Sequence, residues 1–174
     1  MVTIILVLRL EHDYSLKIMY PRWSDKLLTL SSIAESHPHS AYCAFVHDVV
    51  PKWNYVMWTI ESVGSLLKPL EEVLHQHFIL ALTSRDPCCK LERDLLSLPC
   101  RLGGLNIPIP TQISDCQFSA SKQINASLTP LIIHQSKEFS IPSLQSIKCD
   151  ICQAKQQLLN TQFNHIKSCS YSML

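Results

Sequence analysis

The sequence predicts a mainly α-helical protein: an irregular helical bundle of about five to seven helices with one short Gly-Gly turn or strand element. Apolar residues recur three and four positions apart along most of the chain, as they do on one face of an α-helix. Only three glycines occur, whereas ten prolines separate the periodic stretches. Apolar residues make up 47% and charged residues 17%, a balance typical of a globular domain.

Proline and capping residues set the expected helix boundaries in the first half of the chain. A first helix should open at Ser24 as its N-cap and end before His37-Pro38, because the residue before proline avoids the helical region. Ser40 should cap a second helix, and Pro51 suits the first position of a third. The apolar residues expected to pack are Leu27, Leu28, Leu30 and Ile33, then Ala41, Phe45 and Val49, then Trp53, Val56, Met57 and Ile60.

The clearest predicted helix follows a break at Gly64-Ser65. Pro69 lies near its start, where a missing amide hydrogen costs nothing. Asp86-Pro87 then forms a cap and first position for a short helix that ends at Pro99. The clearest helix has apolar residues at helical spacing throughout: Leu66, Leu70, Val73, Leu74, Phe78, Ala81 and Leu82.

The stretch from Cys100 to Pro110 is the one compact non-helical element predicted. Its Gly103-Gly104 pair allows a tight turn with positive φ, and Leu105 and Ile107 are expected to lead into a short buried strand. Another helix is expected from Asp115 onward, continuing past or around Pro130. The organisation predicted is an unassigned segment over residues 1–22, a helical region over 23–139, and a polar tail over 140–174 that is helical, for instance over Gln153 to Phe163, or disordered.

Composition excludes several classes of protein. Fifteen basic and fourteen acidic residues give a net charge of +1 without a Lys/Arg run, so charge neither demands nor excludes a nucleic-acid partner. Three glycines are too few for glycine-rich phosphate loops. The apolar run Val2 to Leu8 is shorter than the roughly 20 residues that span a bilayer, and it has neither the basic start nor the cleavage site of a signal peptide. We therefore expect an intracellular chain, with no membrane partner, whose thiols are reduced and mostly buried.

An ordered series of short motifs resembles the region that follows the polymerase domain in the reverse transcriptase open reading frames of animal retrotransposons. The most specific stretch runs from Arg93 to Pro99 and is followed by Arg101 to Leu105 and Ile107. The match covers about residues 23–139 and departs from the family at Asn106, where a third glycine is usual. Asn tolerates positive φ better than most residues, so the turn can survive. The other residues that carry the match include Trp23, Leu28 to Ser31, Pro38 to Tyr42, Lys52-Trp53, Leu67 to Glu71, Ala81 to Thr83 and Ile132 to Ser136.

The resemblance implies a segment without catalytic residues. A reverse transcriptase holds two metal ions on paired aspartates, and no two aspartates are adjacent anywhere in this sequence. We therefore expect no enzyme activity, no cofactor and no small-molecule substrate. The partners implied are nucleic acid, as an ancestral template–primer contact, or the missing polymerase domain.

The tail contains four residues with the spacing of a zinc finger, Cys149-x2-Cys152-x12-His165-x3-Cys169. A ββα finger also needs an aromatic and a leucine between its ligands, and Gln156 and Gln162 stand at those positions. The alternative is one continuous polar helix, which would keep the two ends of the motif apart. We favour the helix and predict no metal site, while a small zinc-binding module stays the second candidate function.

Other clusters have simpler explanations than a functional site. Glu71, His75 and His77 resemble an acid–base or metal group, but a solvated helix face explains them. Cys100 beside Arg101 has the setting of a reactive thiol without a partner histidine. Trp53, Tyr55 and Trp58 could stack on bases, although Trp53 shares a helix face with Met57 and is expected to be core. A helical interaction protein without a nucleic-acid role is therefore the third candidate function.

Overall fold

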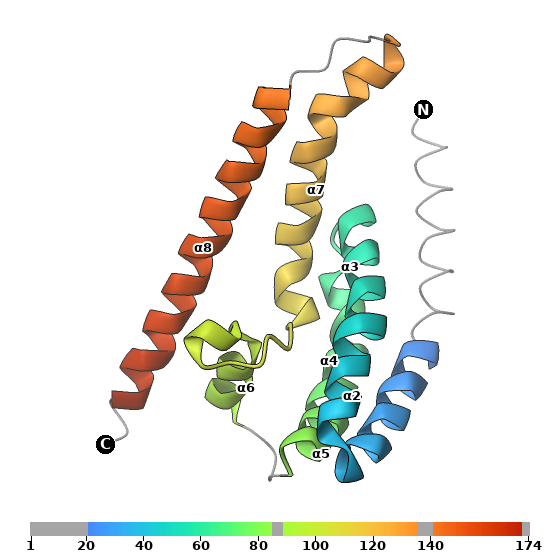
Figure 1. Ribbon diagram of the computed structural model, residues 1–174, viewed down its shortest axis with the longest axis vertical. Helices are drawn as coiled ribbons and strands as arrows, with labels where there is room; N and C mark the ends of the chain where they lie inside the picture. Colours follow the sequence, from blue (N-terminus) through green and yellow to red (C-terminus); the bar gives the residue numbers. More distant parts are fainter. Residues whose placement is uncertain (1–20, 85–88, 136–140, 172–174) are drawn as a thin grey trace.

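The computed structural model describes residues 21–84, 89–135 and 141–171. Every regular element within these ranges is a helix, which confirms the predicted mainly α class (Figure 1). In chain order the elements are a first helix over residues 21–36, α2 (Pro38–Ala44), η1 (Phe45–Val49), α3 (Val50–Thr59), η2 (Gly64–Leu67), α4 (Lys68–Val73), η3 (Leu74–Phe78), α5 (Ile79–Thr83), α6 (Lys90–Ser97), η4 (Cys100–Leu102), α7 (Pro110–Ile133) and α8 (Ile141–Tyr171).

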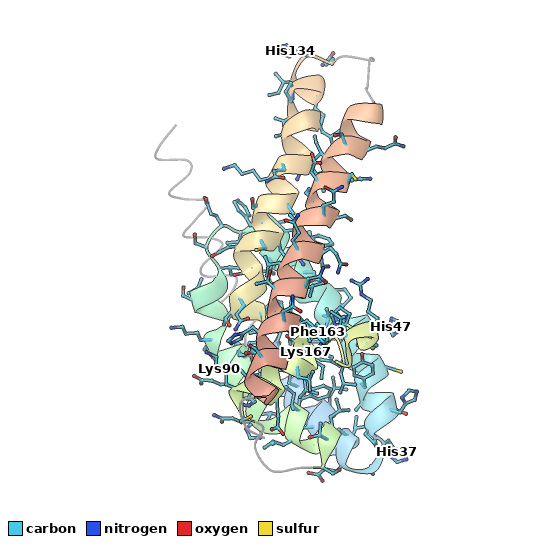
Figure 2. All side chains as sticks on the ribbon, turned by 90° about the vertical axis from the view of Figure 1, so that its left-hand side faces the viewer. His37, His47, Lys90, His134, Phe163 and Lys167 are labelled. Carbon is cyan, nitrogen blue, oxygen red and sulfur yellow. The ribbon has the colours of Figure 1, made fainter. Side chains whose placement is uncertain are left out.

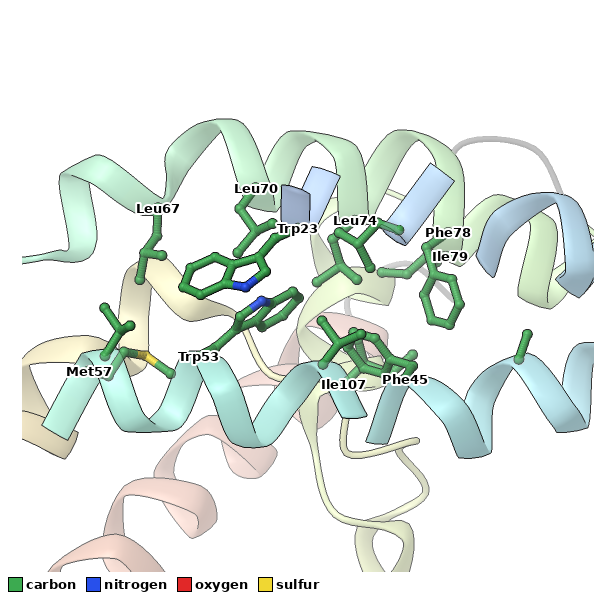
Figure 3. Close-up of a cluster of buried hydrophobic side chains, with 14 of the residues drawn as sticks. Trp23, Phe45, Trp53, Met57, Leu67, Leu70, Leu74, Phe78, Ile79 and Ile107 are labelled. Carbon is green, nitrogen blue, oxygen red and sulfur yellow. The ribbon is translucent and has the colours of Figure 1, made fainter. Parts of the chain in front are cut away.

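The described residues before α7 form a helical body in which three rods run side by side and alternate in direction (Figure 1). The rods are the first helix, the run α2–η1–α3, and the run η2–α4–η3–α5. Their apolar faces meet in one cluster of buried side chains (Figure 3). Phe45 lies at its centre, with ring centroids 5.5 Å from Trp53 and 4.8 Å from Phe78. Burying each such side chain contributes about 1.5–3 kcal/mol, so this cluster is the main source of stability in the body.

Helix boundaries in the first two rods differ from the prediction because proline is accommodated inside the helices. The first helix already includes Pro21, and α2 begins at Pro38 with His37 as its N-cap, so neither Ser24 nor Ser40 is a cap. The predicted end before His37 is confirmed. Pro51 does not start a new helix, since α2, η1 and α3 are continuous. Pro51 lacks an amide hydrogen, and the π-helical turn immediately before it is the kind of irregularity that absorbs such a missing bond.

The second half of the body follows the predicted breaks more closely. The chain breaks ahead of Gly64, and Pro69 lies in the first turn of α4, both as predicted. A side chain at Gly64 would place its Cβ 2.7 Å from the Ser114 hydroxyl, so this glycine allows α7 to approach closely. The predicted cap Asp86-Pro87 lies outside the described residues. Within them α6 begins at Lys90, and the Glu92 carboxylate accepts a hydrogen bond from the Cys89 amide at 3.0 Å.

The predicted strand after the Gly-Gly turn is wrong, since residues 105–109 form no regular secondary structure and belong to no sheet. The amides of Leu105 and Ile107 donate to the Leu96 carbonyl at 3.2 and 3.1 Å, and the Asn106 amide donates to the Leu98 carbonyl at 2.8 Å. These carbonyls are left without helical partners at the end of α6. The segment is therefore held by a helix end instead of a neighbouring strand, while Ile107 is fully buried as predicted.

The last two helices form an arm that extends beyond the body (Figure 1). We use "arm" for α7 and α8, residues 110–133 and 141–171. α7 begins at Pro110 rather than at Asp115 and continues through Pro130, and α8 is far longer than the predicted Gln153 to Phe163. His134 lies at the far end of the arm and Lys167 beside the body (Figure 2). None of the described helices is both long and apolar enough to cross a lipid bilayer.

Both helices of the arm contact the body: the start of α7 packs against α3 and η2, and the C-terminal half of α8 packs against α6. The Gln162 amide donates to the Ser97 hydroxyl at 3.0 Å, and Arg101 donates to Gln156. Ile166 is only 5% exposed. The predicted division of the chain at residues 139 and 140 stays a prediction, but these contacts connect α8 directly to the helical body.

Candidate functional site

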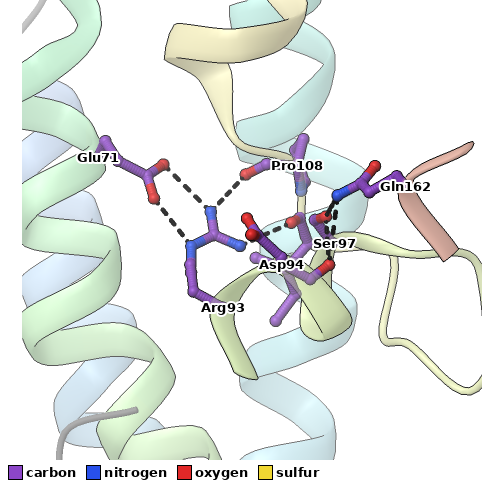
Figure 4. Close-up of polar contacts among 7 residues, drawn as sticks. Glu71, Arg93, Asp94, Ser97, Pro108 and Gln162 are labelled. Atoms are coloured by element: carbon purple, nitrogen blue, oxygen red, sulfur yellow. Dashed lines mark hydrogen bonds and ion pairs between the residues drawn. The ribbon is translucent and has the colours of Figure 1, made fainter. Parts of the chain in front are cut away.

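The most elaborate polar arrangement of the body is a buried arginine clamp between α4, α6 and the segment before α7 (Figure 4). Arg93 is 5% exposed. Its Nε and Nη2 donate to the two carboxylate oxygens of Glu71 at 2.8 and 3.1 Å. Nη1 donates to the Ile107 carbonyl at 3.0 Å, and Nη2 also donates to the Pro108 carbonyl at 2.8 Å. A guanidinium that uses four of its five N–H groups in this way holds three segments together.

The Gly-Gly turn lies next to this clamp and has the backbone that its sequence predicts. Gly103 has a φ of +85°, and Asn106 has a φ of +54°, so asparagine does adopt the left-handed region in place of the family's glycine. Gly104 is required for a different reason, because a Cβ there would lie 2.1 Å from the Leu98 carbonyl oxygen. The turn therefore needs glycine once for conformation and once for space.

A tyrosine from α2 completes the contacts of the turn. The Tyr42 hydroxyl donates to the Leu105 carbonyl at 2.6 Å. Burial raises the pKa of Tyr42, and ionised Cys100 and Cys43 thiols would raise that pKa further. A raised pKa keeps the hydroxyl protonated, and therefore a donor, to higher pH than in an unperturbed tyrosine. This hydrogen bond holds α2 against the turn.

The predicted zinc-type ligands all lie on α8, which is one continuous helix. At about 1.5 Å per residue, Cys152 and His165 are roughly 20 Å apart along the helix. The helix brings together only neighbours, and the Cys169 sulfur lies 3.8 Å from His165 Nε2. Among the residues that the structure describes, no three His, Cys, Asp or Glu side chains are arranged to hold one metal ion.

The prediction that the thiols are mostly buried is wrong for the described cysteines. Most lie on helices at positions that face solvent, and Cys89 is the N-cap of α6. Cys169 is half-buried, while Cys43, Cys89, Cys100, Cys116, Cys149 and Cys152 are exposed.

The Glu71, His75 and His77 cluster does not form. Glu71 is taken up by the arginine clamp. His77 lines an open groove of about 430 Å³ between the first helix and α5, together with Glu35. Because the helix turns these side chains to different surroundings, the three cannot act on one substrate.

The three aromatic residues of α3 divide between core and surface. Trp53 is fully buried and Met57 packs beside it, as predicted for that helix face. Tyr55 is 65% and Trp58 is 47% exposed. The Trp58 indole donates to the Gln117 side chain of α7 at 2.8 Å, which fixes the orientation of its ring. We call Tyr55 and Trp58 the aromatic ledge.

Sequence reasoning did not identify Arg93 as a key residue, although it lies within the most specific motif. Its helix is short, and the one residue that α6 buries is this charged arginine, so apolar periodicity gives no signal. The partner carboxylate is 22 residues away. No known protein family, curated protein or solved structure matches the chain.

Proposed function

We propose that this chain is a non-catalytic helical segment of the kind that follows the polymerase domain in retrotransposon reverse transcriptases. One observation carries the proposal: the residues of the resembling motifs are the ones that build the frame of the body. Arg93 and Glu71 make the clamp, and Gly103 and Gly104 make the turn. Leu67, Leu70, Leu98 and Ile107 are fully buried. A motif series that specifies a fold in this way fits a supporting segment, whose residues position a neighbouring domain or its substrate.

The proposed activity is contact with template–primer through the aromatic ledge. Exposed aromatic rings stack on unpaired bases of any sequence, and each such contact is worth about 1–3 kcal/mol. Trp58 is suited to this role because its hydrogen bond to Gln117 orients the ring before a base arrives, which reduces the entropy lost on binding. The carboxylates that metal-dependent polymerisation requires are supplied by another domain.

Binding of a fluorescent RNA–DNA hybrid with a single-stranded template overhang tests this proposal. We expect anisotropy to report binding that weakens with salt, and Trp58→Ala to lower the affinity by about 1–3 kcal/mol. Leu158→Ala is the matched control, because Leu158 is 58% exposed on α8, away from the ledge. Equal losses in both variants would refute the ledge, and the absence of binding would favour a helical interaction protein without a nucleic-acid role.

Primer extension tests the non-catalytic part of the proposal. The purified chain should not extend a primer with Mg²⁺ or Mn²⁺, because two-metal transfer needs paired carboxylates. Extension above that of a heat-inactivated sample would contradict it.

A further inference from the structure

Two exposed thiols lie one helical turn apart on the arm. Cys149 and Cys152 are both on α8, and both are exposed. Residues three apart on a helix are neighbours, with Cβ atoms about 5–6 Å apart. Thiolate–metal bonds of about 2.3 Å place two sulfurs on one ion within about 4.6 Å of each other, a separation that these side chains reach by rotation about χ1 alone.

The helix separates this pair from the rest of the zinc-type motif. Zn²⁺ sites in proteins are tetrahedral and need ligands beyond two thiolates. His165 is roughly 20 Å from Cys152 along α8, so it cannot supply one. An ion held here must be satisfied by two sulfur ligands.

We propose that Cys149 and Cys152 bind one Cu(I) ion as a two-coordinate bis-thiolate. Soft thiolate ligands select Cu(I), and this closed-shell monovalent ion is stable with two ligands in a line. Binding releases the two thiol protons and leaves a complex of charge −1. This inference does not depend on the proposed contact with template–primer.

The surroundings of the pair favour such a complex. Exposed Lys148 precedes the first thiol, and exposed Lys155 lies one turn beyond the second, so cations outnumber the single carboxylate of Asp150. The Gln153 side-chain amide donates to Cys149 Sγ at 3.6 Å. A thiolate accepts such a bond better than a thiol, and hydrogen bonds of this kind orient metal ligands.

Competition with a coloured Cu(I) chelator tests the site on the full reduced chain under anaerobic conditions. We expect the protein to withdraw one equivalent of Cu(I) from bicinchoninate, and excess Zn²⁺ not to displace it. Cys149→Ser and Cys152→Ser should each weaken retention at least about tenfold, or about 1.4 kcal/mol. Circular dichroism should show unchanged helix content, because both side chains are exposed.

Two control variants separate this site from its alternatives. Cys116→Ser removes an exposed thiol of α7 that has no cysteine one turn away, and His165→Ala removes the imidazole of the zinc-type motif. Neither should change retention of Cu(I). Equal weakening by Cys116→Ser would show unspecific thiol binding, and weakening by His165→Ala would show a longer-range site. Either result, or retention unaffected by Cys149→Ser, would overturn the proposal.

Discussion

The body and the arm are both helical, but they are stabilised in different ways. Every side chain of the central buried cluster belongs to the body, where helices are short and interrupted. The arm contains the two longest described helices, of 24 and 31 residues, yet Ile166 is the one buried large apolar residue among the α8 side chains that the structure describes. Helix length is therefore a poor guide to tertiary stability. Most helical stability in proteins comes from packing an apolar face, so α8 should open locally at lower free energy than the body, whereas α7 packs on α3 and η2.

Breaking the arginine clamp should produce the largest effect. Arg93→Ala leaves the Glu71 carboxylate and two carbonyls inside the body without their donor, and such a loss costs about 3–5 kcal/mol. Urea denaturation measures the change in unfolding free energy. Lys90→Ala, an exposed position of the same helix, is the control and should change it by less than about 0.5 kcal/mol. Similar losses in both variants would show that the clamp contributes nothing specific.

A proline in each region compares the two kinds of helix directly. Ala44→Pro in α2 and Ala154→Pro in α8 both place proline at an exposed helical position, at a local cost of about 3 kcal/mol. We expect the body variant to lower global stability by that amount, because α2 packs into the core. The arm variant should lose hydrogen-exchange protection in α8 only. A global loss from Ala154→Pro would mean that body and arm unfold as one unit.

A substitution that strains the backbone of the turn should lower thermal stability more than the replacement of a nearby thiol. Gly103→Val places a branched residue at a φ of +85°, at a cost of about 1–3 kcal/mol. Nothing lies within 4 Å of the added Cβ, so the cost isolates strain from crowding. Cys89→Ser should be nearly neutral, because serine is a good N-cap and Cys89 is exposed. Thermal denaturation compares the two, and equal losses would contradict the assignment of the turn.

Elements with strong local signals were predictable from the sequence. The periodic series from Leu66 to Leu82 and the stop before His37 are repeated in the structure, because spacing and proline sterics act within a few residues. The position of Pro51 inside a continuous helix was not predictable. A π-helical turn accommodates the missing amide hydrogen, and such a turn has no clear sequence signature. The strand predicted at Leu105 was wrong for a similar reason: this segment bonds to the end of α6, which only the tertiary structure brings near.

The candidate functional residues show the same contrast between local sequence signals and tertiary contacts. Spacing identified the thiols of α8, and the predicted continuous helix, which the structure contains, separates Cys149 and Cys152 from His165. Burial of Trp53 followed from its helix face, whereas the exposure of Trp58 depends on where α7 crosses α3. The structural role of Arg93 could not be recognised from the sequence, because it depends on hydrogen bonds to Glu71 and to carbonyls of a later segment.

The order of these partners along the chain has a consequence for synthesis on the ribosome. Glu71 and Arg93 are made before Ile107 and Pro108, whose carbonyls accept the remaining bonds of the guanidinium. At about 5–20 residues per second, roughly one to three seconds separate the appearance of Arg93 from that of its last acceptor. During that interval a guanidinium placed against α4 would lack two of its hydrogen-bond acceptors. We therefore expect α6 to dock only after the turn has emerged. A slow codon or a pause between these positions would prolong the exposure of the apolar surface that α6 covers.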